Sequence, residues 1–245
     1  MFNFFSKSKE PIDLWFNTDI HAHILPGVDD GSPDVETSLK LVGELRSFGL
    51  KKILASPHIT GGTFENTPAT LDAAQAELDK AMADAGMTDI IVRHHAENRL
   101  DDLFIANFKA GTLLTMPDNY VLIENSFIQE PWDLDQNIFD LQVRGYNPIM
   151  AHPERFTYYQ DKPRRYEELH RNVPFQINVL SLAGHYGKAT KRMAEQLIEG
   201  GMVDFLGTDT HGMKHIETIR AYLASRDAQR HRKLLEGKIR NHIFD

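Results

Sequence analysis

The segment Thr18-Asp19-Ile20-His21-Ala22-His23 decides how the rest of the chain is interpreted, and a glycine-bearing acidic loop over residues 25–31 follows it. In a β-strand the side chains at positions i and i+2 share a face, so His21 and His23 are expected to point the same way where the strand ends. Two neutral imidazoles side by side provide half of a metal site. The pair alone is equally compatible with two histidines that merely end a strand.

The composition sets the class of protein. The chain has 245 residues, 41% of them hydrophobic, which is enough for a large buried core. We interpret residues 1–245 as a single domain, with a loose N-terminal tail over residues 1–10 and a charged helical segment at the C-terminus over residues 216–245. No linker-like stretch or change in composition divides the chain.

Charge and cysteine content exclude several functions. The net charge of -8 argues against binding to a nucleic-acid backbone, which needs a basic face. The absence of cysteine excludes thiolate metal sites and cysteine nucleophiles, and it fits a reducing compartment. No run of residues approaches the roughly 18 apolar residues that a membrane helix needs. We therefore expect a cytoplasmic protein without membrane insertion.

Short apolar runs alternate with helical patterns along the whole chain. After a first strand that ends at His23, six further strands are expected at residues 51–58, 89–95, 119–123, 147–151, 175–179 and 202–207. Ser32 and Pro33 are expected to begin the first helix, and residues 67–68 the second. Strands that alternate with helices indicate an α/β fold with a parallel sheet and helices packed outside it.

Polar residues recur where these strands end. Six of the seven strands finish within one or two residues of a histidine or carboxylate: His21 and His23, His58, Glu97, Glu124, His152, and Asp209 with His211. In a closed (β/α) barrel the carboxyl ends of all strands converge on one face, which is where such barrels carry their chemistry. An open sheet would bring together only the ends of neighbouring strands, so the pattern favours a barrel.

With Asp30 from the first loop, the donor set exceeds what one metal ion needs. Nitrogen and oxygen ligands without sulfur suit Mn, Fe or Zn, and the sequence does not choose among them. Paired ions stabilise in-line displacement at phosphorus and acidify a bridging water to hydroxide. Arg155 follows His152 by three residues and Arg99 follows Glu97 by two, so both are candidates to bind phosphoryl oxygens. Each arginine could instead pair with a neighbouring carboxylate.

Six motifs, in this order, resemble the polymerase-and-histidinol-phosphatase (PHP) superfamily and, within it, the bacterial capsule-associated, metal-dependent protein-tyrosine phosphatases of the CpsB/YwqE type. The motifs span residues 17 to about 215. They are Asp19 to Gly31 (DIHAHILPGVDDG), Ser56-Pro57-His58, Leu122-Ile123-Glu124, His152-Pro153-Glu154-Arg155, Ala183-Gly184-His185-Tyr186-Gly187 and Thr208-Asp209-Thr210-His211.

The resemblance implies a distorted seven-stranded (β/α) barrel that holds two or three divalent metal ions and hydrolyses phosphotyrosine in proteins. The family's substrates are tyrosine kinases that control export of capsular or extracellular polysaccharide. Carried over by position, the resemblance implies a first ion on His21, His23, Glu97 and Asp209, a second on Glu97, Glu124 and His152, a third on Asp30, His58 and His211, and a phosphate contact from Arg155.

The chain departs from the family pattern at one point. Many members carry a further arginine shortly after the last metal ligand, where this sequence has Lys214 and His215, and the nearest arginine is Arg220. This departure leaves the mode of peptide binding open. His185, in a glycine-bounded loop after the sixth strand, is a second candidate for binding substrate.

The remaining polar residues receive simpler interpretations. Asp19 is expected either to hold a ligand imidazole from behind or to cap a strand end. At most one of His94 and His95 can face the centre, and core packing is favoured for both. The histidines on charged helical segments are expected to be solvated: His170, His231 and His242.

Four alternatives remain at this stage, one of them an unrelated amidohydrolase barrel, which the order of the motifs does not support. A small-molecule phosphatase, such as a histidinol-phosphate phosphatase, would use the same metals, and the loops at residues 60–66 and 125–131 would then set the width of the pocket. A metal-dependent exonuclease is disfavoured by the acidic charge. A non-catalytic metal-binding scaffold would show no turnover. The charged C-terminal helix is able to pack on the barrel or on another subunit, so an oligomer is possible.

Overall fold

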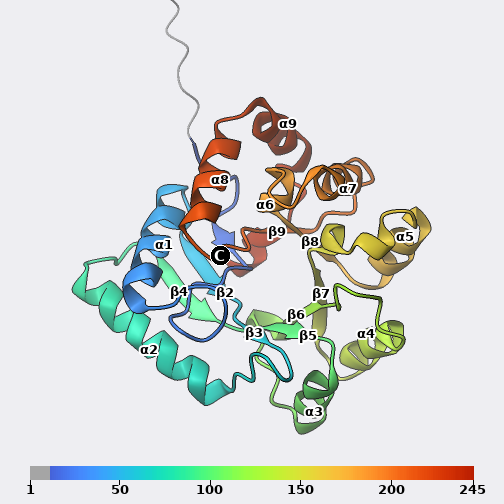
Figure 1. The fold of residues 1–245 in the computed structure, drawn as a ribbon, viewed down its shortest axis with the longest axis horizontal. Coiled ribbons are helices and arrows are strands. Elements are labelled where there is room, and N and C mark those ends of the chain that lie inside the picture. The colour runs from blue at the N-terminus through green and yellow to red at the C-terminus, as the bar shows by residue number, and fades with distance from the viewer. Residues whose placement is uncertain (1–11) are drawn as a thin grey trace, which may run out of the picture.

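The computed structural model describes residues 12–245, a range in which parallel strands alternate with helices (Figure 1). The strands lie at the centre and the helices surround them, following one another in chain order as far as residue 199. The expected loose tail of residues 1–10 falls outside the described residues. The predicted α/β class with parallel strands is confirmed.

The strands form two parallel sheets. The first sheet has the order β1–β2–β4, with bounds Thr18–Asp19, Lys52–Ala55 and Ile91–His94. The second has the order β3–β5–β6–β7–β8–β9, with bounds His58–Ile59, Glu97–Arg99, Tyr120–Glu124, Asn147–Ala151, Phe175–Asn178 and Phe205–Gly207.

Breaks after β2 and after β4 separate the two sheets. The expected strand over residues 51–58 is broken into β2 and β3 at Pro57, which has no N–H to donate to a ladder. The strand expected over residues 89–95 is β4, and a separate strand, β5, follows it after a break at residues 95–96. Backbone hydrogen bonds still cross the breaks, from His95 to Ala55 (2.9 Å) and from Glu97 to Pro57 (3.1 Å). A single continuous sheet closed into a barrel is therefore not what the strand pairing describes.

The helices pack on the outside of the strands. Their bounds are α1 Val35–Ser47, α2 Pro68–Asp84, α3 Asp102–Ala110, α4 Leu134–Val143, α5 Pro163–Asn172, α6 Val179–Leu182, α7 Lys188–Glu199, α8 Met213–Leu223 and α9 Arg226–Leu235. Apolar side chains from Leu14 to Ile239 form one buried cluster between the helices and the strands. Within the described range, no helix has both the length and the apolarity that crossing a bilayer would require.

The start of the first helix differs from the prediction. Asp34, rather than Ser32, caps α1, because its carboxylate accepts a hydrogen bond from the backbone N–H of Thr37 (2.8 Å). Ser32 is buried instead and accepts a hydrogen bond from the hydroxyl of Ser38 (2.9 Å). The predicted start of α2 is confirmed, since Thr67 is its cap.

The C-terminal stretch contains two helices joined at Ser225, whose hydroxyl caps α9 by accepting from the backbone N–H of Ala228 (3.2 Å). The prediction that His231 is solvated is wrong. Its ring is buried, and its Nδ1 atom accepts a hydrogen bond from the hydroxyl of Tyr222 on α8 (2.8 Å). The packing of α9 against α8 buries this face of the helix.

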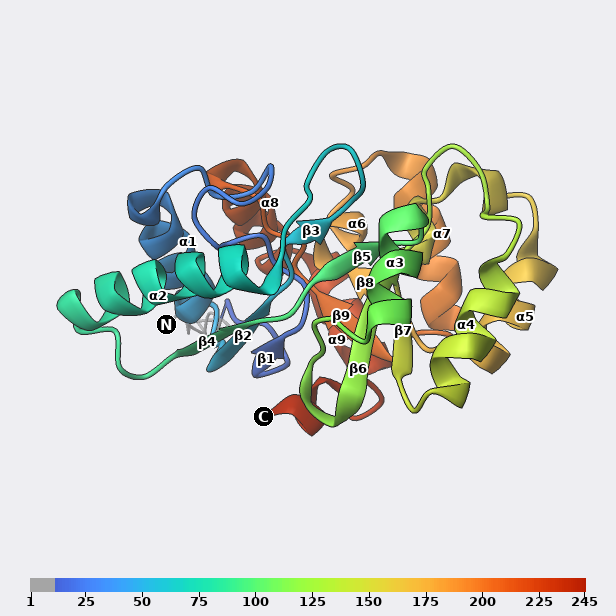
Figure 2. The same ribbon diagram turned by 90° about the horizontal axis from the view of Figure 1, so that it is seen from below.

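The parallel arrangement of the strands determines on which side of the molecule the site lies. All carboxyl ends face the same side of the molecule, the side on which the loop after β3 projects in Figure 2. The C-terminus lies close to β1, on the side of the molecule away from the loop that follows β3. The sheets therefore separate a face built from strand ends and loops from a face built around the start of the strands.

Candidate metal centre and active site

The carboxylate of Glu97 lies at the centre of the buried part of the site. We call this part, formed by His21, His23, Glu97, Glu124, His152 and Asp209, the floor. The Oε2 atom of Glu97, at the start of β5, lies 3.2 Å from Nε2 of His21, 3.3 Å from Nε2 of His23 and 3.2 Å from Nδ1 of His58. Its other oxygen lies 2.9 Å from Nε2 of His152. Residues that are up to 131 positions apart in the chain therefore meet at a single carboxyl group.

Asp209 faces the same pair of histidines from the end of β9. Its Oδ1 atom lies 3.4 Å from Nε2 of His21 and 3.5 Å from Nε2 of His23. Glu124, at the end of β6, lies 3.6 Å from His152. The structure thus gathers the donor atoms into overlapping groups: His21, His23 and Asp209; His21, Glu97 and His152; His58, Glu97 and Glu124; and His23, Asp30, His58 and His211.

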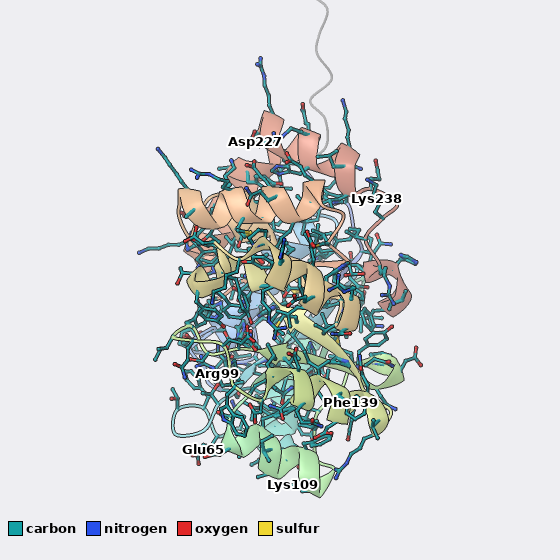
Figure 3. The ribbon with its side chains drawn as sticks, turned by 90° about the vertical axis from the view of Figure 1, so that its right-hand side faces the viewer. Glu65, Arg99, Lys109, Phe139, Asp227 and Lys238 are labelled. Atoms are coloured by element: carbon teal, nitrogen blue, oxygen red, sulfur yellow. The ribbon has the colours of Figure 1, made fainter. Side chains whose placement is uncertain are left out.

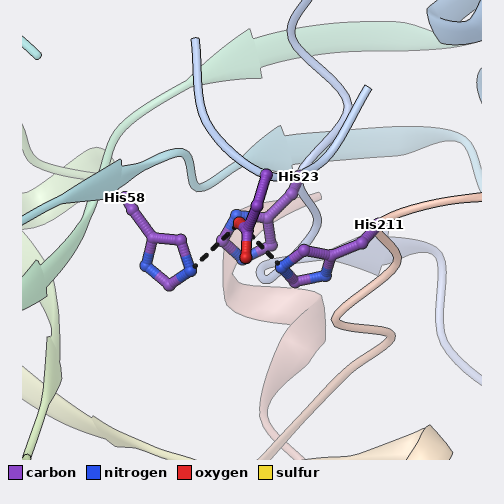
Figure 4. A group of neighbouring side chains, drawn as sticks. His23, His58 and His211 are labelled. Atoms are coloured by element: carbon purple, nitrogen blue, oxygen red, sulfur yellow. Dashed lines mark ion pairs between the residues drawn. The ribbon is translucent and has the colours of Figure 1, made fainter. Parts of the chain in front are cut away.

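The last of these groups lies nearer to the solvent. Figure 4 shows the imidazoles of His23, His58 and His211 close together, and two of them, His58 and His211, form ion pairs with Asp30. Oδ1 of Asp30 lies 3.6 Å from Nε2 of His58 and 3.4 Å from Nε2 of His211. His58 therefore faces Asp30 with one ring nitrogen and Glu97 with the other, so it joins the outer group to the floor.

Two side chains that sequence reasoning missed hold the central imidazoles. Nδ1 of His21 donates to Oε1 of Gln176 (2.7 Å), and Nδ1 of His23 donates to Oδ2 of Asp29 (2.7 Å). Because these acceptors hold a proton on Nδ1, Nε2 is the nitrogen of each ring that faces the site and is left for a metal. Gln176 lies on β8, whose end carries no histidine or carboxylate, and an amide in the sequence does not by itself indicate a metal site.

Asp209 is held on one oxygen only. Its Oδ2 atom accepts hydrogen bonds from Nδ2 of Asn178 (2.6 Å), from the hydroxyl of Tyr186 (2.9 Å) and from Nη1 of Arg155 (2.8 Å). Oδ1 is the atom that faces His21 and His23. The three donors therefore orient the carboxylate and leave its second oxygen for the floor of the site.

The backbone is strained at two of the site residues that follow strand ends. His152 and Asp209 both have positive φ angles, 31° and 53°, which are uncommon for residues other than glycine. Gly207 leaves room for the site in another way, since a Cβ atom there would lie 2.5 Å from Cβ of His21 and 2.9 Å from Nε2 of Gln176. The fold thus tolerates strain and demands a glycine where it positions site residues.

Burial and neighbouring charges perturb the carboxyl groups. Burial, together with the charge of Glu97, raises the pKa of Glu124 to about 8. Burial also opposes ionisation of Glu97, but His21 and the other imidazoles outweigh it and hold the pKa of Glu97 well below its usual range. A cation between the two carboxylates is what would keep both ionised.

The histidines show the complementary effect. Burial lowers the pKa of His152 to about 4, so this ring is neutral and able to act as a ligand. Burial also disfavours the charged form of His21, but Glu97 and Asp209 outweigh it and raise the pKa to about 9. Binding of a metal ion at His21 would therefore release a proton.

These residues fit divalent metal ions. Among the described residues, Nε2 of His21, Nε2 of His23 and Oε2 of Glu97 are buried without a hydrogen bond, although they face one another. Buried polar atoms are otherwise almost always hydrogen-bonded, so such a cluster needs an explanation. Imidazole and carboxylate donors that converge in this way are the ligands of Zn, Mn and Fe sites.

A cavity of about 540 Å³ opens above this floor. Its walls include the two loops expected to set its width, through Phe64 on one side and Phe127 on the other. The ring of Phe64 stacks on His58 and that of Phe127 stacks on His152. The lining residues are Asp30, His58, Thr60, Thr63, Phe64, Arg99, Glu124, Phe127, Arg155, Tyr186, Asp209, His211 and His215.

Both candidate arginines line this cavity. The guanidinium of Arg155 lies between two aromatic rings, with Cζ 4.2 Å from the ring centre of Tyr186 and 4.8 Å from that of Phe127. Arg99 pairs with Oε2 of Glu124 (3.1 Å) and reaches the same phenyl ring at 5.9 Å. Arg155 and Arg99 therefore each pair with a carboxylate, and each also lines the cavity.

The structure separates the other candidates. The exposed His185 is not among the side chains that line the cavity, whereas its neighbour Tyr186 and the residue His215 are. The ring of His185 packs edge-on against His215, with 4.6 Å between ring centres. Arg220 lies outside the cavity and pairs with Glu44. Of the residues that follow Asp209 and His211, His215 therefore lines the cavity and Arg220 does not.

Asp19 caps strand ends and does not hold an imidazole. Its carboxylate accepts from the backbone N–H groups of His21 and Thr208 (3.1 Å each) and from the hydroxyl of Thr208 (2.6 Å). His95 is buried, as expected, with Nε2 3.1 Å from the carbonyl of Ile20, and burial lowers its pKa to about 3.

The remaining two histidines differ in environment. His170, which was expected to be solvated, is only partly exposed and lies 2.8 Å from Asp204. His242 is exposed, as expected.

Several histidines and carboxylates at the ends of parallel strands, beneath a cavity that carries two arginines, are typical of metal-dependent phosphoesterases. The chain belongs to the capsular polysaccharide synthesis CpsB/CapC family, whose model matches residues 17–234. The family predicted from the sequence is thus confirmed.

Relatives and solved structures agree with this assignment. The chain is 33% identical over 198 residues to tyrosine-protein phosphatase YwqE of Bacillus subtilis, an alignment that covers 80% of this chain and 78% of the relative. It is also similar, with 30% identity and a TM-score of 0.76 over 91% of this chain and 96% of the other, to a crystal structure from work on YwqE and on CpsB of Streptococcus pneumoniae, described as unique metal-dependent tyrosine phosphatases.

A more distant structure shares the fold alone. Histidinol phosphate phosphatase from Lactococcus lactis, solved with zinc, L-histidinol and phosphate, has a TM-score of 0.50 at 17% identity, over 84% of this chain and 91% of the other.

Proposed function

We propose that this chain is a metal-dependent protein-tyrosine phosphatase that hydrolyses phosphotyrosine at the floor described above. The family and its relatives, which are named tyrosine-protein phosphatases, support this function over the histidinol-phosphate alternative. The observation that carries the proposal is the convergence of three imidazoles on one oxygen of Glu97, beneath a cavity wall that holds Arg155.

We propose two or three divalent ions, of Mn, Fe or Zn, at this site. His21, His23, Glu97 and Asp209 would hold the first, Glu97, Glu124 and His152 the second, and Asp30, His58 and His211 the third. When bound, such ions supply Lewis-acid stabilisation of phosphoryl oxygens and lower the pKa of water towards neutrality. The two contacts of His58 indicate that it is able to serve the second and third positions alike.

The side chains of the wall would bind the substrate. Arg155, held flat between Tyr186 and Phe127, presents a planar guanidinium suited to two phosphoryl oxygens at once. Arg99 lies on the other side of Phe127 and adds a second positive charge. A phosphotyrosine whose phosphate contacts both arginines would place its own ring against Phe127 and opposite Phe64.

The reaction does not require a dedicated proton donor. The oxygen of water forms a bond to phosphorus while the bond from phosphorus to the phenolic oxygen breaks. A phenolate with a pKa near 10 leaves without a strong general acid. Tyr186 does not fill that role, because its hydroxyl donates to Asp209 and its pKa is raised by burial and by that carboxylate.

We further propose the wider setting expected from the sequence: a cytoplasmic enzyme of one domain that acts on a tyrosine kinase of capsular or extracellular polysaccharide export. We also treat the two sheets as a distorted (β/α) barrel. The parallel bridge between Ala22 and Thr210, with the hydrogen bond from His23 N to Thr210 O (2.9 Å), supports this view by linking the two sheets at their far edges.

Metal depletion and reconstitution test the function. The protein is stripped with a chelator, reloaded separately with Mn²⁺, Fe²⁺ or Zn²⁺, and assayed side by side on a phosphotyrosine peptide and on histidinol phosphate. We expect the stripped protein to be inactive and at least one metal to restore hydrolysis of the peptide in preference to histidinol phosphate. Undiminished turnover after complete depletion, or preference for histidinol phosphate, would contradict the proposal.

A further inference from the structure

The segment Asn125–Trp132, between β6 and α4, presents large apolar side chains to solvent and contributes Phe127 to the cavity wall. Ile128 is 88% exposed and Trp132 is 95% exposed. Phe127, the residue before Ile128, lines the cavity itself. Large apolar side chains that lie exposed next to one another usually mark an interaction site.

The backbone of this segment is anchored from behind. The hydroxyl of Tyr158 donates to the carbonyl of Ser126 (2.9 Å), and the hydroxyl of Ser126 accepts from the N–H of Ile128 (3.2 Å). At the other end, Arg165 on α5 pairs with Glu130 (2.6 Å). The exposed side chains are therefore carried on a loop that is fixed at both ends, which reduces the entropy lost on binding.

The segment is continuous with the phosphate-binding wall. The ring centre of Phe127 lies 4.8 Å from Cζ of Arg155 and 5.9 Å from Cζ of Arg99. A phosphotyrosine bound by these arginines packs against Phe127, and its neighbours in the chain follow at about 3.8 Å per residue. Those neighbours would then lie near the residues that follow Phe127, among which Ile128 and Trp132 are exposed.

We infer that Ile128 and Trp132 form a docking surface for apolar side chains adjacent to the phosphotyrosine in the substrate protein. This inference rests on the proposed function, and it extends that function from phosphotyrosine to the sequence around it. Burying an apolar side chain against such a surface is worth about 1.5–3 kcal/mol, or roughly tenfold or more in affinity. The enzyme would thus select among phosphotyrosine sites by the residues that flank them.

Another exposed aromatic provides a matched control. Phe139 on α4 is also exposed, but in Figure 3 it lies towards the opposite edge of the molecule from Arg99 and Glu65. Phe139 does not line the cavity and lies seven residues beyond Trp132 on α4. Replacing this residue changes surface apolarity without changing the docking surface.

The test compares two phosphotyrosine peptides that differ only in the residues flanking the phosphotyrosine, leucine in one and serine in the other. Metal-loaded wild type, the double variant Ile128→Ser/Trp132→Ser and the control Phe139→Ser are assayed on both peptides and on p-nitrophenyl phosphate. We expect wild type and the control to favour the leucine peptide about tenfold in kcat/KM, mainly through KM. The double variant is expected to lose this preference and to hydrolyse p-nitrophenyl phosphate at the wild-type rate.

Each other outcome is decisive. Equal kcat/KM for the two peptides with wild type, or the same loss of preference with Phe139→Ser, overturns the docking surface while leaving the phosphatase intact. Sedimentation that shows a wild-type dimer and a monomeric double variant assigns the surface to a second copy and also overturns it. No hydrolysis of any phosphotyrosine substrate by the metal-loaded wild type overturns the proposed function instead.

Discussion

The two ends of the strands are built from similar polar residues and satisfy them in opposite ways. At the carboxyl ends, Nε2 of His21 and Oε2 of Glu97 are buried without a hydrogen bond. At the opposite end, the buried Asn241 accepts from the N–H of Leu206 (3.0 Å) and donates to the carbonyls of Thr18 (2.9 Å) and Leu206 (2.8 Å). The carboxyl ends keep these atoms available for ligands, whereas Asn241 uses both atoms of its amide for stability.

The largest expected effect falls on the floor. Asp209→Ala removes the carboxylate that faces both His21 and His23, so it should abolish metal binding and activity together. Because metal ions are worth several kcal/mol of transition-state stabilisation, we expect kcat/KM to fall by at least about 10³-fold. Elemental analysis and a phosphotyrosine-peptide assay on the same sample measure both effects. An active, metal-replete variant would show that Asp209 is not a ligand.

Arg155→Ala should distinguish the binding of phosphate by the cavity wall from the binding of metal by the floor. Arg155 contacts Asp209 through Oδ2, whereas Oδ1 faces the histidines, so we expect the metal content to stay at the wild-type level. Loss of the guanidinium should lower kcat/KM for phosphotyrosine about 10²- to 10³-fold, the range seen when one electrostatic contact to the transition state is removed. Steady-state kinetics with parallel metal analysis checks this, and loss of metal from the variant would contradict it.

Gln176→Leu probes the support behind His21. Without the acceptor for its Nδ1 proton, the imidazole loses its fixed tautomer, and we expect metal affinity to weaken about 10- to 100-fold. Titration of the stripped protein with Zn²⁺ against a competing chelator measures the affinity. Unchanged affinity would mean that the amide packs beside the ring without orienting it.

Asn241→Ala tests the opposite end of the strands. The substitution leaves the N–H of Leu206 and two carbonyls without partners, so the free energy of unfolding should fall by about 1–3 kcal/mol. Urea denaturation measures this loss. Metal content and kcat should be unchanged in the folded variant, and a selective loss of activity would show that the two ends are coupled.

The smallest effect is a pH dependence at the same end. Burial opposes ionisation of Asp204, but hydrogen bonds from His170 and from the N–H of Phe175 outweigh it and lower its pKa. A carboxylate with a lowered pKa stabilises the fold above its unfolded pKa of about 3.9, and this contribution is lost as the pH falls through the folded value. Asp204→Asn should therefore be less stable than wild type at pH 7, and by a smaller amount at pH 3. Urea unfolding at both pH values checks the sign, and a difference that grows on acidification would contradict it.

The floor could be predicted from the sequence because strand ends are visible in one dimension. His21, Glu97, His152 and Asp209 each follow a short apolar run, and parallel strands bring such positions to one face whatever the details of pairing. The interruption at Pro57 could have been anticipated from its missing N–H, but the division into two sheets depends on pairing that periodicity does not specify.

The supports and the docking surface could not be predicted in the same way. Gln176 and Asn178 are amides on a strand without a histidine or carboxylate at its end, and their partners are set by three-dimensional register. Ile128 and Trp132 look like ordinary loop residues in the sequence, and only their exposure beside the cavity distinguishes them. His231 was misplaced because a charged helix conceals which of its faces packs against α8.

The central claim is that the floor holds metal ions between His21, His23, Glu97 and Asp209. Anomalous diffraction from crystals of the reconstituted enzyme, collected at the absorption edge of the bound metal, tests it most directly. We predict strong peaks about 2.0–2.2 Å from Nε2 of His21 and Nε2 of His23. Crystals of active enzyme that show no peak there, or show the metal elsewhere on the molecule, would contradict the account.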